Sequence, residues 1–393
     1  MTQTSLDRVA WLLPDMGTGG ISFQHILSEF AQIFPNTITF TGQWPGYAAG
    51  LEPNFSVEVV GATRYIEIIK AANGYSIGFS AASLQIVRRL WQFKPQLIFA
   101  NAFTAWTAIA LLLKPICRWK VIITYEGGSA IYENPNSTIR YQARRMMARL
   151  ADAFVVNSRA GKTYLLDILQ VNPERVFAKP FLVPSLPTLL QSSATEAPQI
   201  DASVKRPIFL SVGQIIPRKG LKNLIAACNI LQQQGYENYT LAIVGDGEQQ
   251  PELAALVKES GLEKQVLWMG KIPYRCLGAY FQLADVFILP TYDDIWGMVV
   301  PEAMAFGKAV ICSTGAGAAE MVAAGANGFV YPPDDIERLA GYMQQFLDNP
   351  DSIRSMGDIS AQIMLEHTPE TATACFVEAI EFVDRNITSK QRI

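Results

Sequence analysis

The sequence contains few of the residues from which proteins usually build metal and disulfide sites. It has two histidines, His25 and His367, so a histidine-based metal site is not expected. Its five cysteines are odd in number and include no Cys-x-x-Cys pair. This pattern predicts reduced thiols in a cytoplasmic compartment rather than a disulfide framework.

Strong charge of either sign and long apolar runs are also missing. The 32 basic and 35 acidic residues give a net charge of −3, so no basic excess indicates a nucleic-acid partner. The longest apolar stretch, around 105–113, is too short to span a membrane, and residues 1–8 lack the apolar core of a signal peptide. The 50% hydrophobic content excludes a disordered chain. We therefore expect a soluble cytoplasmic protein, and its 393 residues suggest two or three domains at roughly 100–200 residues each.

Short apolar runs alternate with helix-length amphipathic segments along the first half of the chain. Strands are predicted at 9–13, 55–60, 97–100, 121–125 and 153–157. Helices are predicted between them, at 21–34, 83–93, 105–113 and 159–169. Because parallel strands need long crossover connections, this alternation predicts a doubly wound α/β domain.

A break in the pattern divides the chain in two. Residues 187–206 are rich in Ser, Thr, Ala and Pro, and we interpret them as a linker between residues 1–186 and 207–370. Beyond the linker, strands are predicted at 208–212, 239–244, 266–269, 286–290 and 309–313. The chain then becomes helical after residue 335. A ligand is expected between two such halves, at the carboxyl ends of the strands.

The strongest candidate site lies in the segment 292–322, which follows an apolar strand. Two carboxylates, Asp294 and Glu302, stand eight positions apart with Gly297 between them. Pro301 indicates the start of a helix, because proline is tolerated in a first helical turn. A phosphate is favoured by the unpaired amides of such a helix start, here Gly297, Met298 and Val299. The alternative is ordinary strand–turn–helix packing with both acids in solvent.

Three further segments have the composition of a nucleotide site. Adjacent cations, Arg218 and Lys219, stand before Gly220 and a predicted helix, an arrangement suited to gripping a phosphate. A strand runs into a glycine turn at Gly245, and the loop at Ile272 offers backbone against which a planar base can lie. Each pattern alone is also typical of a surface turn, so their weight comes from occurring together and in this order.

Taken in order, these segments resemble the glycosyltransferase group 1 family, which is family 4 of the retaining glycosyltransferases. Members carry a glycine-arginine turn and a lysine-glycine pair, then a Val-Gly-x-Gly turn, a Gly-x-Val/Ile loop, and a Glu-x7-Glu motif followed by Ala-Met-Ala-x-Gly. The resemblance runs from about 211 to 331 and rests on Gly213-Gln214, Lys219-Gly220, Val244–Gly247, Gly270–Ile272, and Asp294 to Glu302 followed by Ala303–Gly307.

The resemblance implies the GT-B fold, an α/β architecture of two Rossmann-like, doubly wound domains facing each other across a cleft. The first domain would take the acceptor and the second the nucleotide sugar. The last helix, about 371–393, would return to the first domain.

The resemblance also implies roles for single residues. Lys219 would hold the donor diphosphate, Glu302 the ribose, and Asp294 hydroxyls of the transferred sugar. The base would lie against Ile272. The remaining implied donor-binding residues are Gly19, Gly20, Gln214, Arg218, Gly245, Gly297, Met298 and Val299.

The sequence departs from the family pattern at three places. Asp294 replaces the first glutamate of the motif, and Gln214 replaces the usual arginine, so Arg218 is expected to turn toward the diphosphate instead. Many members place a histidine after a middle strand of the first domain, where this chain has none in 123–128. Glu126 is therefore the third catalytic candidate beside Lys219 and Asp294, in contact with the acceptor or the reacting sugar. A carboxylate that caps a turn is the alternative.

A basic amphipathic segment, IRYQARRMMARL at 139–150, lies in the first half. Such a helix can contact an anionic membrane surface, as in family members with lipid-linked acceptors. The alternative is a helix that is simply packed and solvated.

The resemblance predicts an enzyme of polysaccharide biosynthesis type that moves a sugar from a nucleoside-diphosphate sugar to a glycan, lipid-linked or small-molecule acceptor, with retention of configuration. The chain has no Asp-x-Asp triplet, so we expect backbone amides and Lys219 to stabilise the leaving diphosphate without a metal or other cofactor. A catalytically silent GT-B module that binds a nucleotide sugar, and a nucleotide-sugar epimerase, are the alternatives. A two-lobed periplasmic binding protein is disfavoured, since no signal peptide is expected.

Overall fold

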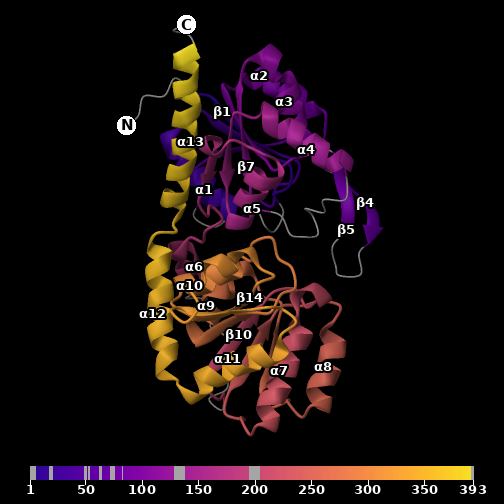
Figure 1. Ribbon diagram of the computed structural model, residues 1–393, viewed down its shortest axis with the longest axis vertical. Helices are drawn as coiled ribbons and strands as arrows, with labels where there is room; N and C mark the ends of the chain where they lie inside the picture. The colour runs from indigo at the N-terminus through magenta and orange to yellow at the C-terminus, as the bar shows by residue number, and fades with distance from the viewer. Residues whose placement is uncertain are drawn as a thin grey trace. The chain divides into compact units, whose positions relative to one another are not determined.

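The chain folds into two compact units, which Figure 1 draws in one continuous colour scale. The computed structural model describes residues 6–16, 21–47, 51, 54–61, 64–70, 76–81, 83–127, 138–193 and 204–390. Unit 1 combines the described residues up to Val183 with those from His367 onward, and unit 2 runs from Pro184 to Glu366. The C-terminal segment therefore belongs to the same unit as the N-terminal one.

Unit 1 is built on a parallel sheet with the strand order β3-β2-β1-β6-β7-β8-β9. Its strands are β1 (Val9–Leu13), β2 (Thr37–Thr41), β3 (Ser56–Val59), β6 (Leu97–Asn101), β7 (Lys120–Tyr125), β8 (Ala153–Val156) and β9 (Val176–Ala178). A separate antiparallel ribbon consists of β4 (Arg64–Lys70) and β5 (Ser76–Ala81). The helices are α1 (Ile21–Ile33), α2 (Gln85–Phe93), α3 (Ala105–Cys117), α4 (Thr138–Leu150), α5 (Arg159–Thr163), which continues as a π-helix over Tyr164–Ile168, and α13 (Pro369–Lys390).

The inner strands of this sheet are nearly continuous apolar runs, as is typical of a parallel sheet buried on both faces. β1 and β8 are buried at every position. Val9 of β1 pairs in parallel with Thr37 of β2 on one side and with Leu97 of β6 on the other. The strand order therefore reverses between β1 and β6, and ligands usually bind at the carboxyl ends of the strands at such a reversal.

Helix α13 packs on unit 1 through aromatic contacts. The ring of Phe376 lies 5.1 Å from that of Trp11 and 5.4 Å from that of Phe99, measured between centroids. Trp11 and Phe99 stack at 4.4 Å, and all three rings are fully buried. Burying each such ring is worth roughly 1.5–3 kcal/mol, so this contact holds the last helix on a sheet formed by the start of the chain.

Unit 2 is built on a second parallel sheet, with the strand order β12-β11-β10-β13-β14-β15. Its strands are β10 (Ile208–Val212), β11 (Thr240–Val244), β12 (Val266–Gly270), β13 (Val286–Leu289), β14 (Ala309–Ser313) and β15 (Gly328–Tyr331). Its helices are α6 (Leu186–Ser193), α7 (Leu221–Gln233), α8 (Gln250–Glu259), α9 (Leu277–Leu283), α10 (Val299–Ala305), α11 (Ile336–Asp348) and α12 (Asp351–Leu365). One buried cluster, which includes Phe209, Ile243 and Phe346, joins the strands to α7 and α11.

The structure adds elements that the sequence pattern did not predict, among them β2, β9, β15 and the β4–β5 ribbon. β2 has the sequence TITFT, in which polar threonines interrupt the apolar pattern that predicts a buried strand. Thr39 and Thr41 are nevertheless buried. β15 begins with a glycine because a Cβ at Gly328 would overlap the carbonyl oxygen of Val310 on β14. The segment interpreted as a linker begins with helix α6.

Candidate active site

The candidate residues of unit 2 gather at the carboxyl ends of β10, β11 and β13. Lys219 lies in the loop after β10, Gly245 directly follows β11, and Asp294 lies in the loop after β13. Parallel strands end at the same edge of a sheet, so these loops are neighbours. A small cavity between them is lined by residues that include Gly213, Lys219 and Leu289. This edge also contains the reversal of strand order between β10 and β13.

The loop after β13 is held in place by the loop after β14. The amide of Asp294 donates to the carbonyl of Gly315 at 2.8 Å, and the amide of Gly317 donates to the carbonyl of Asp294 at 3.1 Å. A Cβ at Gly315 would overlap the carbonyl oxygens of Thr291 and Tyr292. Glycine is therefore required at Gly315, and the close approach of the two backbones fixes the position of Asp294.

Gly297 turns the chain from this loop into helix α10. Its φ is +89°, and an added Cβ would lie 2.9 Å from Cδ2 of Leu289. The helical hydrogen bonds begin with the amide of Val300, which donates to the carbonyl of Gly297 at 2.9 Å. The predicted amide donors precede that first bond at the start of α10, as expected of a helix N-terminus, and are Gly297, Met298 and Val299.

Glu302 is a buried carboxylate on α10, the helix that follows the loop of Asp294. Its side chain is 2% exposed, and its Oε1 accepts a hydrogen bond from the hydroxyl of Tyr274 at 2.8 Å. Its Oε2 is buried and has no hydrogen-bond partner among the described residues. Burial raises the pKa of Glu302 to about 7, although the bond from Tyr274 favours the ionised form. A hydroxyl that donated to Oε2 would satisfy this buried acceptor.

Lys219 and Asp294 form an ion pair in which Lys219 Nζ contacts Asp294 Oδ2. Both side chains are largely buried, with 15% and 19% of their surface exposed. Gly220, at φ +68°, lets the loop after β10 approach β13, because a Cβ there would overlap the carbonyl oxygen of Pro290. The structure therefore brings together two of the three catalytic candidates.

Arg218 and Gln214 differ in how the structure places them. Arg218 donates from Nη1 to the carbonyl of Asp293 at 2.6 Å, and its own carbonyl accepts from the amide of Tyr292 at 2.8 Å. Its side chain thus binds the loop that carries Asp294. Gln214 is exposed in the loop after β10. The sequence position of Arg218 beside Lys219 could not distinguish a loop-binding role from a phosphate-binding one.

Two loops carry the remaining donor candidates of unit 2. Gly245 directly follows β11, its amide donates to the carbonyl of Gly270 at 2.9 Å, and a Cβ on it would overlap the carbonyl oxygen of Gly213. Ile272 is half-buried in the loop after β12. The roles of Gly245 and Ile272 in donor binding therefore stay predictions.

In unit 1, Glu126 follows the carboxyl end of β7. Burial raises its pKa, and a hydrogen bond with Asn101, the last residue of β6, acts in the opposite direction. Gly127, at φ +113°, follows it, and a Cβ there would overlap Oγ of Ser158. The predicted contributors Gly19 and Gly20 lie outside the described residues.

Two residues of these sites escaped the sequence interpretation. Tyr274 lies in a 3₁₀ turn (Tyr274–Cys276) before α9, and nothing in its neighbours singles it out. Asn101 is a polar residue that ends the apolar strand LIFAN, at the edge where ligands usually bind. This position at the end of a buried strand could have identified Asn101 as a candidate site residue.

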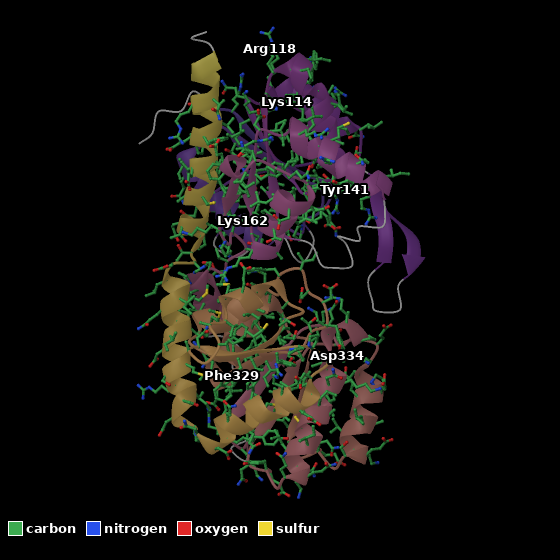
Figure 2. The ribbon with its side chains drawn as sticks, in the orientation of Figure 1. Lys114, Arg118, Tyr141, Lys162, Phe329 and Asp334 are labelled. Atoms are coloured by element: carbon green, nitrogen blue, oxygen red, sulfur yellow. The ribbon has the colours of Figure 1, made fainter. Side chains whose placement is uncertain are left out.

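The basic helix α4 is only partly available for other partners. Arg144 lies 5.6 Å from the ring centroids of Phe103 and Tyr164, and it donates to the Tyr164 hydroxyl at 3.0 Å. Arg145 lies 5.9 Å from the centroid of Tyr141, which Figure 2 labels. Two of its four arginines therefore bind other residues of unit 1.

Neither a metal-binding cluster nor a membrane-spanning helix occurs in the described ranges. No cluster of three or more His, Cys, Asp or Glu side chains there has a geometry that could hold a metal ion. Among the helices of that part of the chain, none combines the length and apolarity needed to cross a bilayer.

Two sequence profiles match most of the chain. The profile described as Glycosyl transferases group 1 matches residues 193–362, and the one described as Glycosyltransferase Family 4 matches residues 40–178. The first covers the strands and loops that carry Lys219, Asp294 and Glu302.

Curated relatives match over shorter regions. An alpha-D-kanosaminyltransferase of Streptomyces kanamyceticus is 24% identical over 240 residues, which are 60% of this chain and 61% of that protein. A putative colanic acid biosynthesis glycosyltransferase of Salmonella typhimurium is 34% identical over 154 residues, 37% of this chain and 38% of that protein. The chain thus spans at most 61% of the length of these two relatives.

Solved structures match over nearly the whole length. The Anabaena protein HepE, in complex with UDP, has a TM-score of 0.72 at 17% identity and covers 95% of this chain and 99% of its own. A glycosyltransferase from Rickettsia africae has a TM-score of 0.75 at 15% identity and covers 96% and 99%.

These likenesses and the two parallel sheets define the class of protein, a two-domain, Rossmann-like α/β protein with the GT-B fold. Within that class, the chain belongs to the group 1 glycosyltransferases.

Proposed function

We propose that the chain is a glycosyltransferase that uses a nucleoside-diphosphate sugar as donor. The observation that carries this proposal is the buried Oε2 of Glu302, which has no hydrogen-bond partner among the described residues. Glu302 lies on α10, the helix that follows the loop of Asp294, and Asp294 pairs with Lys219. A ribose hydroxyl would donate to that oxygen. Because Oε2 is buried, donor binding must open its surroundings.

Each charged residue of this site has a distinct role in the proposed reaction. The bond between the sugar and the diphosphate breaks, and negative charge grows on the leaving phosphate. Lys219 would stabilise that charge, since a cation in a largely buried site acts strongly on it. Asp294 would bind hydroxyls of the transferred sugar. The ion pair brings these two charges into contact.

We further propose that transfer proceeds with retention of configuration and without a metal. The amides of Gly297, Met298 and Val299 would then contact the phosphate or the sugar. In unit 1, Glu126 would contact the acceptor or the reacting sugar, and burial, which raises its pKa, favours the protonated carboxyl. Because HepE is described with UDP and with UDP-glucose, uridine donors are the first to try.

A donor screen tests this function directly. The protein is incubated with a panel of nucleotide sugars and acceptor extracts, and release of the nucleoside diphosphate is followed together with the thermal shift caused by each donor. We expect one donor to stabilise the protein and to release its diphosphate. Stabilisation without release under every acceptor condition would instead support a silent nucleotide-sugar-binding module.

We also propose that a lipid-linked acceptor brings unit 1 to the membrane surface through α4, in a protein of polysaccharide biosynthesis that works in the cytoplasm. Ile139 and Met146 on this helix are 85% and 56% exposed. Vesicles of phosphatidylglycerol should bind the protein, and the double variant Arg140→Gln/Arg149→Gln should bind them less than Lys258→Gln/Lys264→Gln, which removes the same charge from unit 2. Equal binding by both variants would contradict this role of α4.

A further inference from the structure

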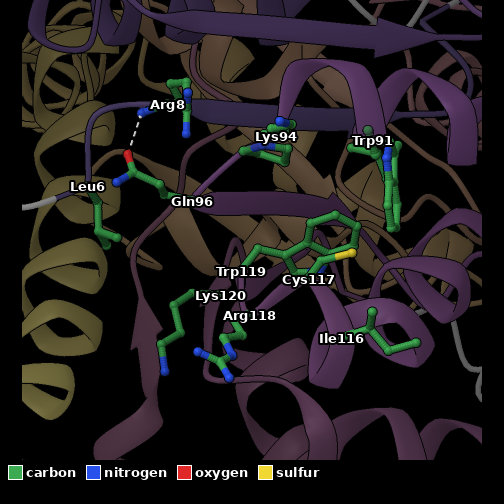
Figure 3. A pocket seen from close by; sticks show the side chains of 12 residues that line it. Leu6, Arg8, Trp91, Lys94, Gln96, Ile116, Cys117, Arg118, Trp119 and Lys120 are labelled. Carbon is green, nitrogen blue, oxygen red and sulfur yellow. Dashed lines mark hydrogen bonds between the residues drawn. The ribbon is translucent and has the colours of Figure 1, made fainter. Parts of the chain in front are cut away.

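A cavity of about 640 Å³ lies in unit 1, at the edge of the sheet opposite to Glu126. It is formed by residues that precede β1 and β6, by the first residue of β7, and by the ends of α2 and α3 (Figure 3). Glu126 follows the carboxyl end of β7, whereas Lys120, which lines the cavity, is the first residue of that strand. The cavity is therefore separate from the edge at which the proposed acceptor contact lies.

Basic side chains line the cavity, and no acidic residue is among its described lining residues. Four basic side chains take part, and these are Arg8, Lys94, Arg118 and Lys120. Within the described residues, only Lys120 has a carboxylate in ion-pair range, at 3.7 Å from Asp152. Asp152 is itself engaged by Lys114 at 2.7 Å. A concave surface with unneutralised cations attracts anions.

A comparable cavity in unit 2 shows that this charge imbalance is not general. That cavity, of about 430 Å³, also lies near the amino ends of its strands, but its basic residues face two carboxylates, Asp285 and Asp358. Arg206, on its wall, pairs with Asp285. The cavity of unit 1 therefore carries a concentration of one sign of charge that its counterpart lacks.

Two of the cations occupy backbone positions that usually hold glycine. Lys94 ends α2 with φ 51°, and Arg118 ends α3 with φ 59°. A left-handed residue at a helix C-terminus is normally glycine, because any side chain there costs energy. Figure 2 shows the Arg118 side chain extending from the end of α3. Each helix therefore ends in a cation that lines this cavity, at a backbone position where glycine would make the protein more stable.

The other side of the cavity is apolar and open. Trp91 is 60% exposed and Ile116 is 70% exposed, although both are large apolar side chains. In the view of Figure 3 they lie on the side away from Arg8 and Gln96. Trp119 also lines the cavity and is buried, with its indole N–H donating to the carbonyl of Ala110 at 2.9 Å. Its ring is a fixed part of the wall.

We propose that this cavity binds a phosphate ester that carries an apolar group. The phosphate would lie among Arg8, Lys94 and Arg118, and the apolar group would cover Trp91 and Ile116. Such chemistry occurs both in soluble phosphate esters and in the headgroup region of anionic lipids. The proposal does not depend on the donor site of unit 2.

The test is calorimetric titration with dihexanoyl phosphatidic acid, kept below its micelle concentration. Dihexanoyl phosphatidylcholine and inorganic phosphate are the comparison ligands, and both should bind more weakly. The double variant Lys94→Gly/Arg118→Gly should lose at least about tenfold in affinity, as expected when charge-assisted hydrogen bonds are removed. The same variant should melt at a higher temperature, since glycine relieves both left-handed positions. This combination separates a binding role from a structural one.

Matched variants control for charge and for apolar surface. Arg88→Gln removes an exposed cation from α2 outside the cavity and should bind like the wild type. Ile116→Ser should weaken binding, whereas Leu112→Ser, which removes a similarly exposed aliphatic side chain outside the cavity, should not. Equal affinities for all these variants would overturn the proposal, as would equal binding of inorganic phosphate or of phosphatidylcholine.

The source of the ligand is decided with vesicles. If phosphatidylglycerol vesicles bind the wild type but bind Lys94→Gly/Arg118→Gly at least about tenfold more weakly, the ligand is a membrane lipid. If the variant changes only the binding of the soluble ester, the ligand is a free metabolite. Both outcomes support the cavity as a phosphate site. UDP or a UDP-sugar should leave the titration unchanged, so failure at this cavity and failure of the donor site give different results.

Discussion

The hydroxyl of Tyr274 donates a hydrogen bond of 2.8 Å to Oε1 of Glu302, while the second oxygen of that carboxylate is buried without a partner among the described residues. A buried carboxylate with one oxygen satisfied costs stability unless a ligand completes it. This arrangement is the basis of the proposal that Glu302 binds the donor.

Replacing Glu302 with Gln should stabilise the protein without donor and abolish its binding of the donor. The pKa of Glu302 is raised from 4.5 to about 7, so the folded state binds more protons than the unfolded state between those values, and stability falls as pH rises through that range. The neutral amide avoids this loss, which amounts to on the order of 3 kcal/mol above pH 7. Chemical denaturation at pH 5 and pH 8 measures the difference. A variant as pH-dependent as the wild type would contradict this account of Glu302.

Replacing Tyr274 with Phe should move the acid limb of donor binding to higher pH. The Tyr274 hydroxyl stabilises the ionised Glu302, so its removal raises the pKa of that carboxyl further. One charge-assisted hydrogen bond of about 1.5–3 kcal/mol corresponds to roughly one to two pH units. The control is Tyr236→Phe, which removes another 2.8 Å bond from a tyrosine to a carboxylate, that of Asp348. Identical shifts in both variants would show that the effect does not arise at Glu302.

The Lys219–Asp294 ion pair should show strong coupling in a double-mutant cycle. Each single alanine variant leaves a largely buried charge without its partner. The sum of the stability losses in the two single variants should therefore exceed the loss in the double variant by about 1–3 kcal/mol. Activity should separate the two roles, because Lys219→Ala should lower kcat about 10²–10³-fold, whereas Asp294→Glu retains turnover. Additive stabilities would mean that the pair does not form in solution.

Replacing Gly297 with Ala should damage the donor site beyond its backbone cost. Gly325→Ala is the matched control, since Gly325 has φ +78° and open space around it, whereas a Cβ at Gly297 meets Leu289 at 2.9 Å. The control should lose about 1–2 kcal/mol of stability, and Gly297→Ala should lose about 1–3 kcal/mol more. Gly297→Ala should also lose the thermal shift caused by the donor. Equal stabilities of the two variants would refute the crowding at Gly297.

Replacing Glu126 with Gln should lower turnover while leaving donor binding unchanged. The carboxyl belongs to unit 1, and its pKa is raised by burial, so its loss should also flatten one limb of the pH–rate profile. Asn101→Ala, which removes the bond that favours ionisation, should move that limb to higher pH. A turn-capping role predicts instead a loss of thermal stability with an unchanged pH profile.

The α/β class and the order of the site segments could be read from the sequence, because apolar runs, glycine turns and the spacing of Asp294 and Glu302 are local features. The missed strands are those whose local pattern is ambiguous. β2 carries threonines that become buried only after it pairs with β1 and β3, and β15 starts with a glycine whose reason is the backbone of the neighbouring strand. Pairing partners are not encoded in a single segment.

Local sequence patterns were enough to predict the family, the parallel-sheet architecture and the candidates Lys219, Asp294 and Glu302. Which of these candidates come into contact, and which other residues contact them, depends on the packing of elements that are far apart in the sequence. Tyr274 reaches Glu302 across 28 positions, and Arg218 binds the loop of Asp294 rather than standing free beside Lys219. The cavity of unit 1 likewise combines the ends of two helices with the starts of three strands. Periodicity and spacing specify elements, whereas contacts between distant elements depend on how those elements pack.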